Sequence, residues 1–326
     1  NVPGFFTRND ADNFNRGRMA EYLGLPAATE DVGNLGGTFD VSRFFCLVGT
    51  NWQDYTVAAG WSRRLTGPMS DGLVRIVNAT VYSRAAGAEK RQGPRAFVHR
   101  SHSGHYGIVN SEEGYQNLVR FLFGDVRVDG VLELDEITLP KEVQKAREAG
   151  KTIRASYHFE TVVRVRGYDW ELHRRTVREE SAIFRTFDEM FPRAAGEKPR
   201  HPHLFSVFLS AGARVKTNRP SLGFAIDLGV LVPEYEVDGF LWRDQHYAGS
   251  YLFRDTVTIE ATPQTDDQGR TTFSIKYGLD SKTPNRAPTK VELQKVGQTH
   301  VCEIPLASRS RPGLKGRLVL TARPWE

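Results

Sequence analysis

Three histidines, His99, His102 and His105, lie within the segment RAFVHRSHSGHYG. Imidazole is a frequent zinc ligand and also titrates close to neutral pH, so the cluster suggests a metal site or a catalytic base. The spacing matches no common zinc pattern, neither cysteine of the chain is close in sequence, and His99 falls in the apolar run AFVHR. The pattern therefore favours a catalytic base, and we expect neither a metal nor a cofactor. The plainer alternative is that all three are ordinary loop histidines.

A candidate acid for this base precedes the histidines. Asp71 lies in the loop TGPMSDG, after the apolar run VSRFFCLVGT (41–50) and before the segment GLVRIVNA. Compact apolar runs between polar loops are typical of buried parallel strands, and RAFVHR (95–100) is a second candidate. A carboxylate bound to one ring nitrogen of a histidine would fix the tautomer and stabilise the imidazolium that forms on proton transfer.

The order of these features resembles the C-terminal part of an α/β-hydrolase of the lipase or esterase kind. In that family the triad runs serine, acid, histidine along the chain. The acid stands at a strand end, and the histidine lies in the loop before the final helix. Here SDGLV carries Asp71 and FVHRSHSGHYG carries the histidine. The resemblance implies a serine hydrolase acting on an acyl-ester or lipid substrate. From this resemblance we expect His105, which follows a glycine, to be the base, with His102 as the second candidate.

The nucleophile that the resemblance requires is not found in this sequence. The family's elbow is G-x-S-x-G, upstream of the acid, and no such motif occurs. Ser62 follows Gly60 at the right spacing but lacks the second glycine, and Ser70 directly precedes Asp71. We therefore expect the serine on an upstream segment or a companion N-terminal chain, which would also cover the open edges and the bare face of a half sheet. The alternative is a non-catalytic binding or structural protein that works through its second half.

The elements around these residues predict an α/β architecture in the first part of the chain. The segment NFNRGRMAEYLGL (13–25) reads as a short helix, and SEEGYQNLVRFLFG (111–124) is the clearest helix, with Ser111 as its N-cap. Apolar residues recur along this second helix at helical spacing, which predicts a stripe that packs on a core. The stripe consists of Tyr115, Leu118, Val119 and Leu122.

The second half of the sequence has a different pattern of apolar and polar residues. Short alternating runs such as TIRASYHFETVVRVRG and GRLVLTARPW follow one another between turn residues, which is typical of an antiparallel β-sandwich. The segment KEVQKAREAG (141–150) reads as a helical connector, and AIFRTFDEMF (182–191) as an inserted helix. We therefore predict α/β plus all-β, with the C-terminal part of an α/β-hydrolase sheet over 1–140 and a β-sandwich accessory domain over 141–326.

Composition narrows the classes of partner. The net charge is +5, and 44 basic residues are interspersed with 39 acidic ones, so no block of charge indicates a nucleic-acid partner. No run approaches the roughly 18 apolar residues of a transmembrane helix, and the first residues do not have the pattern of a signal peptide. Two cysteines exclude a disulfide-framed fold. The sequence indicates no particular compartment.

Overall fold

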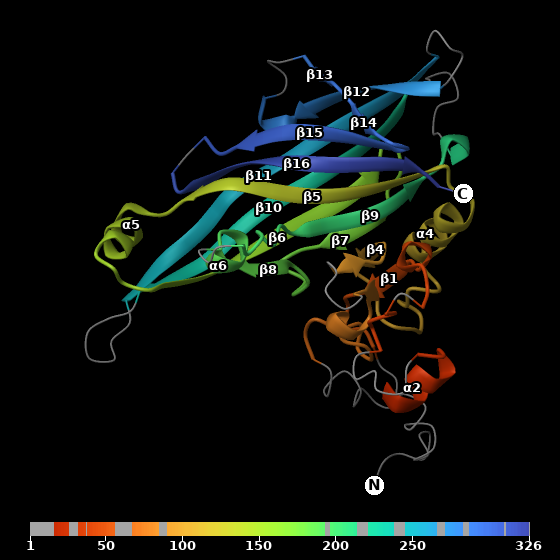
Figure 1. The fold of residues 1–326 in the computed structure, drawn as a ribbon, viewed down its shortest axis with the longest axis horizontal. Helices are drawn as coiled ribbons and strands as arrows, with labels where there is room; N and C mark the ends of the chain where they lie inside the picture. The colour runs from red at the N-terminus through yellow and green to blue at the C-terminus, as the bar shows by residue number, and fades with distance from the viewer. Residues whose placement is uncertain are drawn as a thin grey trace. The chain divides into compact units, whose positions relative to one another are not determined.

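The protein forms two compact units, Asn1–Tyr115 and Gln116–Glu326. The computed structural model (Figure 1) describes residues 16–25, 32–36, 38–55, 67–84, 90–192, 196–213, 221–237, 245–265, 271–282, 287–309 and 311–325. The division between the units falls inside helix α4 (Glu112–Phe123).

The first unit contains two parallel strands, β1 (Cys46–Gly49) and β4 (Arg95–Val98), paired with Val48 opposite Phe97. Both lie inside the apolar runs that predicted strands. Its other elements are α2 (Arg16–Tyr22), the 3₁₀ turns η1 (Val41–Arg43) and η3 (Ile76–Asn78), and the antiparallel strands β2 (Tyr82–Ser83) and β3 (Arg91–Gln92). Among the described residues, the buried core cluster of this unit is small and consists of Val48, Ile76 and Phe97.

The second unit is β-rich and its strands pair antiparallel, in agreement with the alternating runs of the sequence. One sheet has the order β13-β12-β11-β10-β6-β7, with β8 also on β6, and the other has the order β14-β15-β16-β5-β9. The first is built from β6 (Ile153–Val165), β7 (Glu171–Arg175), β8 (Ile183–Thr186), β10 (Leu222–Val237), β11 (Gln245–Thr265), β12 (Thr271–Leu279) and β13 (Thr289–Val291). The second is built from β5 (Val126–Thr138), β9 (His203–Leu209), β14 (Gln294–Val296), β15 (Thr299–Ala307) and β16 (Gly313–Pro324).

Both sheets contribute to one hydrophobic core. Alternate residues of β10, such as Ile226 and Leu228, and of β16, such as Leu318 and Leu320, are buried in the same cluster. This alternation is the period-2 pattern of strands with one face on a core. The predicted connector helix is observed as α5 (Lys141–Glu148). The predicted inserted helix forms only in its second half, as α6 (Phe187–Met190), because its first half pairs with β6 as strand β8. The turns η4 (Ala211–Ala213) and η5 (Asp280–Lys282) complete the unit.

The boundary between the units lies earlier than the predicted boundary at residue 140. The reason is β5, which hydrogen-bonds along its length to β16 and also pairs with β9. Both partners follow β5 by many residues, so no local pattern in the sequence of β5 reveals where it pairs. A strand with two partners in the second unit belongs to that unit.

Helix α4 forms as predicted, but three of the four residues of its apolar stripe are exposed, and Val119 is half-buried. Tyr115, Leu118 and Leu122 are 59%, 53% and 55% exposed. The helix buries a polar face instead: Asn117 donates a hydrogen bond to the carbonyl of Leu172. On the same face the guanidinium of Arg120 lies 4.7 Å from the ring centroid of Trp170. A large apolar stripe left in solvent is a feature that usually marks a surface of association.

A buried hydroxyl in the second unit gives a prediction about stability. Tyr235 is fully buried and its hydroxyl has no hydrogen-bond partner among the described residues; burial raises its pKa to about 12. Because an unpaired buried hydroxyl is destabilising, Tyr235→Phe should leave the free energy of unfolding unchanged or raise it by up to about 1 kcal/mol. The matched control is Tyr251→Phe. The hydroxyl of Tyr251 donates a hydrogen bond to Glu160 at 2.8 Å, and its removal should lower the free energy of unfolding by about 1 kcal/mol. Chemical denaturation measures both, and a clear loss in Tyr235→Phe would contradict the prediction.

Candidate functional site

Asp71 and His102 meet in a direct hydrogen bond within the first unit. The distance from Asp71 Oδ2 to His102 Nδ1 is 2.9 Å. The Asp71 side chain is nearly buried, at 7% exposure, whereas the His102 side chain is 38% exposed. His102 follows β4 by four residues, and Asp71 lies in the connection between β1 and β4. The pair therefore consists of a shielded carboxylate and an imidazole that solvent can reach.

The loop around Asp71 holds the carboxylate in place. Asp71 Oδ1 accepts hydrogen bonds from the backbone N–H groups of Leu73 at 3.0 Å and Val74 at 2.7 Å. The backbone N–H of His102 donates to the carbonyl of Asp71 at 2.9 Å. One carboxylate oxygen is thus engaged by the backbone, and the other is directed at the imidazole. The backbone link from His102 to Asp71 fixes the two residues relative to each other, independently of their side chains.

Glycines permit this close arrangement. Gly72 has φ +94°, and a Cβ at this position would lie 2.2 Å from Tyr55 Cβ. The Tyr55 ring in turn contacts the His102 ring edge to face, with centroids 5.9 Å apart. At the end of β1, a Cβ on Gly49 would lie 2.8 Å from Asp71 Cβ. Both positions therefore require glycine, one for its backbone conformation and the close approach of Tyr55, the other for the approach of Asp71.

The histidine loop separates His102 from His105. Ser101 and Gly107 form a parallel bridge, and the N–H of Ser101 donates to the carbonyl of Tyr106 at 3.1 Å. This bridge closes residues 102–106 into a tight loop, with His102 at its base beside Asp71. His105 lies at the exposed tip, where its ring contacts the ring of Tyr106.

The remaining histidine of the cluster lies apart from the pair. His99 directly follows β4, and its Nδ1 lies 3.5 Å from Thr50 Oγ1. The structure thus brings Asp71 together with His102, the second choice from sequence, and with neither His105 nor His99.

An ion pair ties the histidine loop to helix α4. Both nitrogens of the Arg100 guanidinium fork bind Glu113, at 2.9–3.1 Å, and Glu113 lies in the first turn of the helix. Ser111 caps this helix, because its Oγ accepts a hydrogen bond from the N–H of Gly114 at 3.0 Å. This is the cap that the sequence predicted. Residues on both sides of the loop are therefore anchored, which limits the movement of His102.

The pair has the chemistry of a general base. An ionised carboxylate can only accept hydrogen bonds, so His102 carries its proton on Nδ1 when it faces Asp71. The lone pair is then on Nε2, and this atom has no hydrogen-bond partner among the described residues. A base needs such an open position to take a proton from a nucleophile.

No serine hydroxyl of the described residues is bonded to the imidazole of His102. Ser70 is buried and its Oγ donates to the carbonyl of Gly67 at 2.6 Å, while accepting from the N–H of Gly72. It shapes the Asp71 loop. Ser62 lies outside the described residues.

The described residues contain neither a metal-binding cluster nor a disulfide. Over the described ranges, no group of three or more His, Cys, Asp or Glu residues could hold a metal ion. In the same part of the chain, no helix is long and apolar enough to cross a membrane. Cys46 and Cys302 are both free thiols. Burial raises the pKa of Cys302 to about 11, so this thiol is protonated and unreactive at neutral pH.

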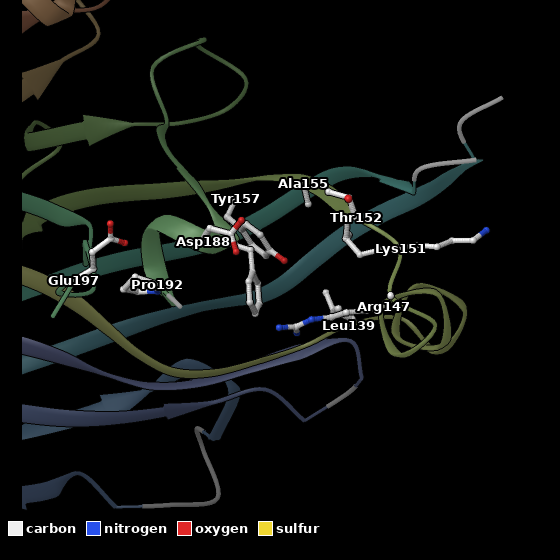
Figure 2. Close-up of a pocket in the computed structure, with 12 residues that line it drawn as sticks. Leu139, Arg147, Lys151, Thr152, Ala155, Tyr157, Asp188, Pro192 and Glu197 are labelled. Carbon is white, nitrogen blue, oxygen red and sulfur yellow. The ribbon is translucent and has the colours of Figure 1, made fainter. Parts of the chain in front are cut away.

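A polar pocket of about 400 Å³ lies in the second unit, beside α5 and α6 (Figure 2). Its charged residues have both signs: Arg147 and Lys151, with Asp188 and Glu197. The Arg147 guanidinium lies 4.6 Å from the ring centroid of Phe187, and Tyr157 forms part of the wall. Figure 2 shows the Lys151 side chain directed away from the other labelled side chains. The sequence does not predict this pocket, because its residues come from segments that are brought together only by the fold.

Comparison with protein-family models, with curated proteins and with solved structures found no match.

Proposed function

We propose that this chain supplies the acid and the base of a serine hydrolase that cleaves acyl esters. The observation that carries the proposal is the 2.9 Å hydrogen bond between buried Asp71 and partly exposed His102. In the proposed reaction, His102 Nε2 takes the proton of a serine hydroxyl as the oxygen attacks the acyl carbonyl. Asp71 stabilises the imidazolium, which then protonates the leaving alcohol. Water, activated by the same imidazole, releases the acid from the acyl-enzyme.

The serine of this proposal comes from an upstream segment or a companion chain. Two features of the described residues support such a partner. Over the described ranges, the core cluster around β1 and β4 is small, with Val48, Ile76 and Phe97 as its buried members. In addition, the apolar stripe of α4 is exposed. A partner that extends the β1–β4 sheet and covers this stripe would supply both a core and the nucleophile.

The test is made on the protein purified under mild conditions from its source. We expect a polypeptide segment with a G-x-S-x-G elbow to be present, either in the same chain or co-purifying with it. A fluorophosphonate should label that serine, and intact mass with peptide mapping would locate the label. The hydrolase proposal would be contradicted if the protein is folded and homogeneous without such a segment and takes no label. It would favour the alternative of a non-catalytic binding protein.

A further inference from the structure

The second unit contains an apolar cavity of about 540 Å³ between its two sheets. The residues that line it from one sheet include Phe224, Ile259 and Ile275, and those from the other include Val128, Cys302 and Leu320. This space is a partly open pocket rather than an enclosed void. Its volume lies within the range of pockets that hold small ligands.

The register of the strands places the lining residues of each sheet side by side on neighbouring strands. In the first sheet, Leu222 lies opposite Ala261, which lies opposite Ile275. In the second, His300 lies opposite Ala322, which lies opposite Val128. All of these residues line the cavity. They stand at alternate positions of their strands, which is the set that faces a core. The same faces pack solidly further along, where Ile226, Leu228 and Leu318 are buried.

The chemistry of the lining residues limits the class of ligand that the cavity can bind. A peptide segment would bring backbone N–H and C=O groups that need partners. Six of the lining strands, β5, β10, β11, β12, β15 and β16, have a neighbouring strand on both sides, and Leu209 of the edge strand β9 pairs with Val126 of β5. Their backbone groups are therefore engaged in the sheets. Three lining residues have charged or ionisable polar side chains, Asp125, His300 and Arg323, and the others are apolar apart from the thiol of Cys302. Most of the wall therefore offers water no hydrogen-bond partner.

We propose that this cavity binds the hydrocarbon chain of a fatty acid or of an acyl ester. A flexible hydrocarbon chain can adapt to the space between two sheets and needs no hydrogen bonds along its length. Burial of its methylene groups supplies the binding free energy. The proposal concerns the second unit alone and goes beyond the hydrolase function, since a unit that binds acyl chains would serve an enzyme or a binding protein equally.

The test uses the full chain, delipidated, with oleate as the probe at concentrations below micelle formation. We expect saturable binding of oleate by isothermal titration calorimetry. Ala261→Phe places a ring in the cavity and should weaken binding by about tenfold or more, the effect of excluding roughly two methylene groups. Thr262→Phe is the matched control, because the adjacent residue of β11 faces the other way and does not line the cavity. It should bind oleate as the wild type does.

Further variants and a second probe distinguish acyl-chain binding from a folding defect and from the hydrolase function. Ala261→Phe should keep or raise the melting temperature; if it fails to fold, Ala322→Leu provides a smaller filling change with the same expected direction. Asp71→Asn should bind oleate normally, so a failure of the hydrolase proposal leaves this result untouched. Methyl oleate distinguishes the two sources of the chain: equal binding indicates that the chain suffices, and weaker binding indicates a free fatty acid. Absence of saturable binding to either probe, or equal loss in the Ala261 and Thr262 variants, would overturn the inference.

Discussion

Under the proposed function, replacing His102 with alanine in the assembly that contains the serine is expected to lower the rate of ester hydrolysis by about 10³-fold or more. The side chain contributes the only imidazole bonded to Asp71 in the described part of the first unit. Without it, the serine has no base and the leaving alcohol has no proton donor. Asp71→Asn should have an effect of similar size, because an amide that donates to Nδ1 would favour the wrong tautomer of His102. Fluorophosphonate labelling and steady-state hydrolysis of a short-chain ester measure both variants.

His105→Ala is the matched control for this experiment. His105 lies three residues away in the same loop, at the exposed tip, and its ring contacts Tyr106. Its removal should leave the hydrolysis rate within about twofold of the wild type, as for a surface substitution away from the reacting atoms. Loss of activity in His105→Ala with retention in His102→Ala would reverse the assignment and require a different loop conformation. Circular dichroism would establish that each variant is folded.

The acid candidate could be predicted from sequence, whereas the choice of histidine could not. Asp71 stands in a glycine- and proline-rich loop after an apolar run, and the structure gives it the histidine partner that this context suggested. The choice among three histidines depends on where β4 ends and on how the loop closes. Those features are fixed by the Ser101–Gly107 bridge and by the backbone bond from His102 to Asp71. Neither interaction has a signature in residue type or spacing.

In the fold, too, features set by neighbouring residues could be predicted, whereas contacts between residues far apart in sequence could not. Helix α4 and its Ser111 cap are local features, and the sequence predicts them correctly. The face that the helix buries depends on distant residues, because Asn117 binds the backbone of Leu172 and Arg120 lies over Trp170. An apolar stripe predicts that a face is covered, yet it does not say which polypeptide covers it. The exposure of the stripe reflects which face of α4 the distant residues bind, and its cover by a companion segment stays a prediction.

Gly72→Ala is expected to have the second large effect, on both stability and rate. The substitution adds a Cβ at φ +94° and 2.2 Å from Tyr55 Cβ, so strain and overlap act together. We expect a loss of roughly 2–5 kcal/mol in local stability, from about 1–2 kcal/mol of backbone strain and about 1–3 kcal/mol of overpacking. Movement of Tyr55 would also release the His102 ring. Because misplacement of a catalytic group by about 1 Å costs roughly 10²-fold, the hydrolysis rate should fall by at least that factor.

Gly104→Ala separates the two contributions. Gly104 also has positive φ, +90°, but a Cβ there meets no atom within 4 Å. This variant should therefore show the backbone strain alone, about 1–2 kcal/mol, with little change in the hydrolysis rate. Hydrogen exchange of the backbone amides of Leu73 and Val74, which bind Asp71, reports the local stability in each variant. Equal protection in Gly72→Ala and Gly104→Ala would mean that the contact with Tyr55 does not position the Asp71–His102 pair. A larger loss in Gly72→Ala would identify Tyr55 as a positioning residue that holds the imidazole against its carboxylate.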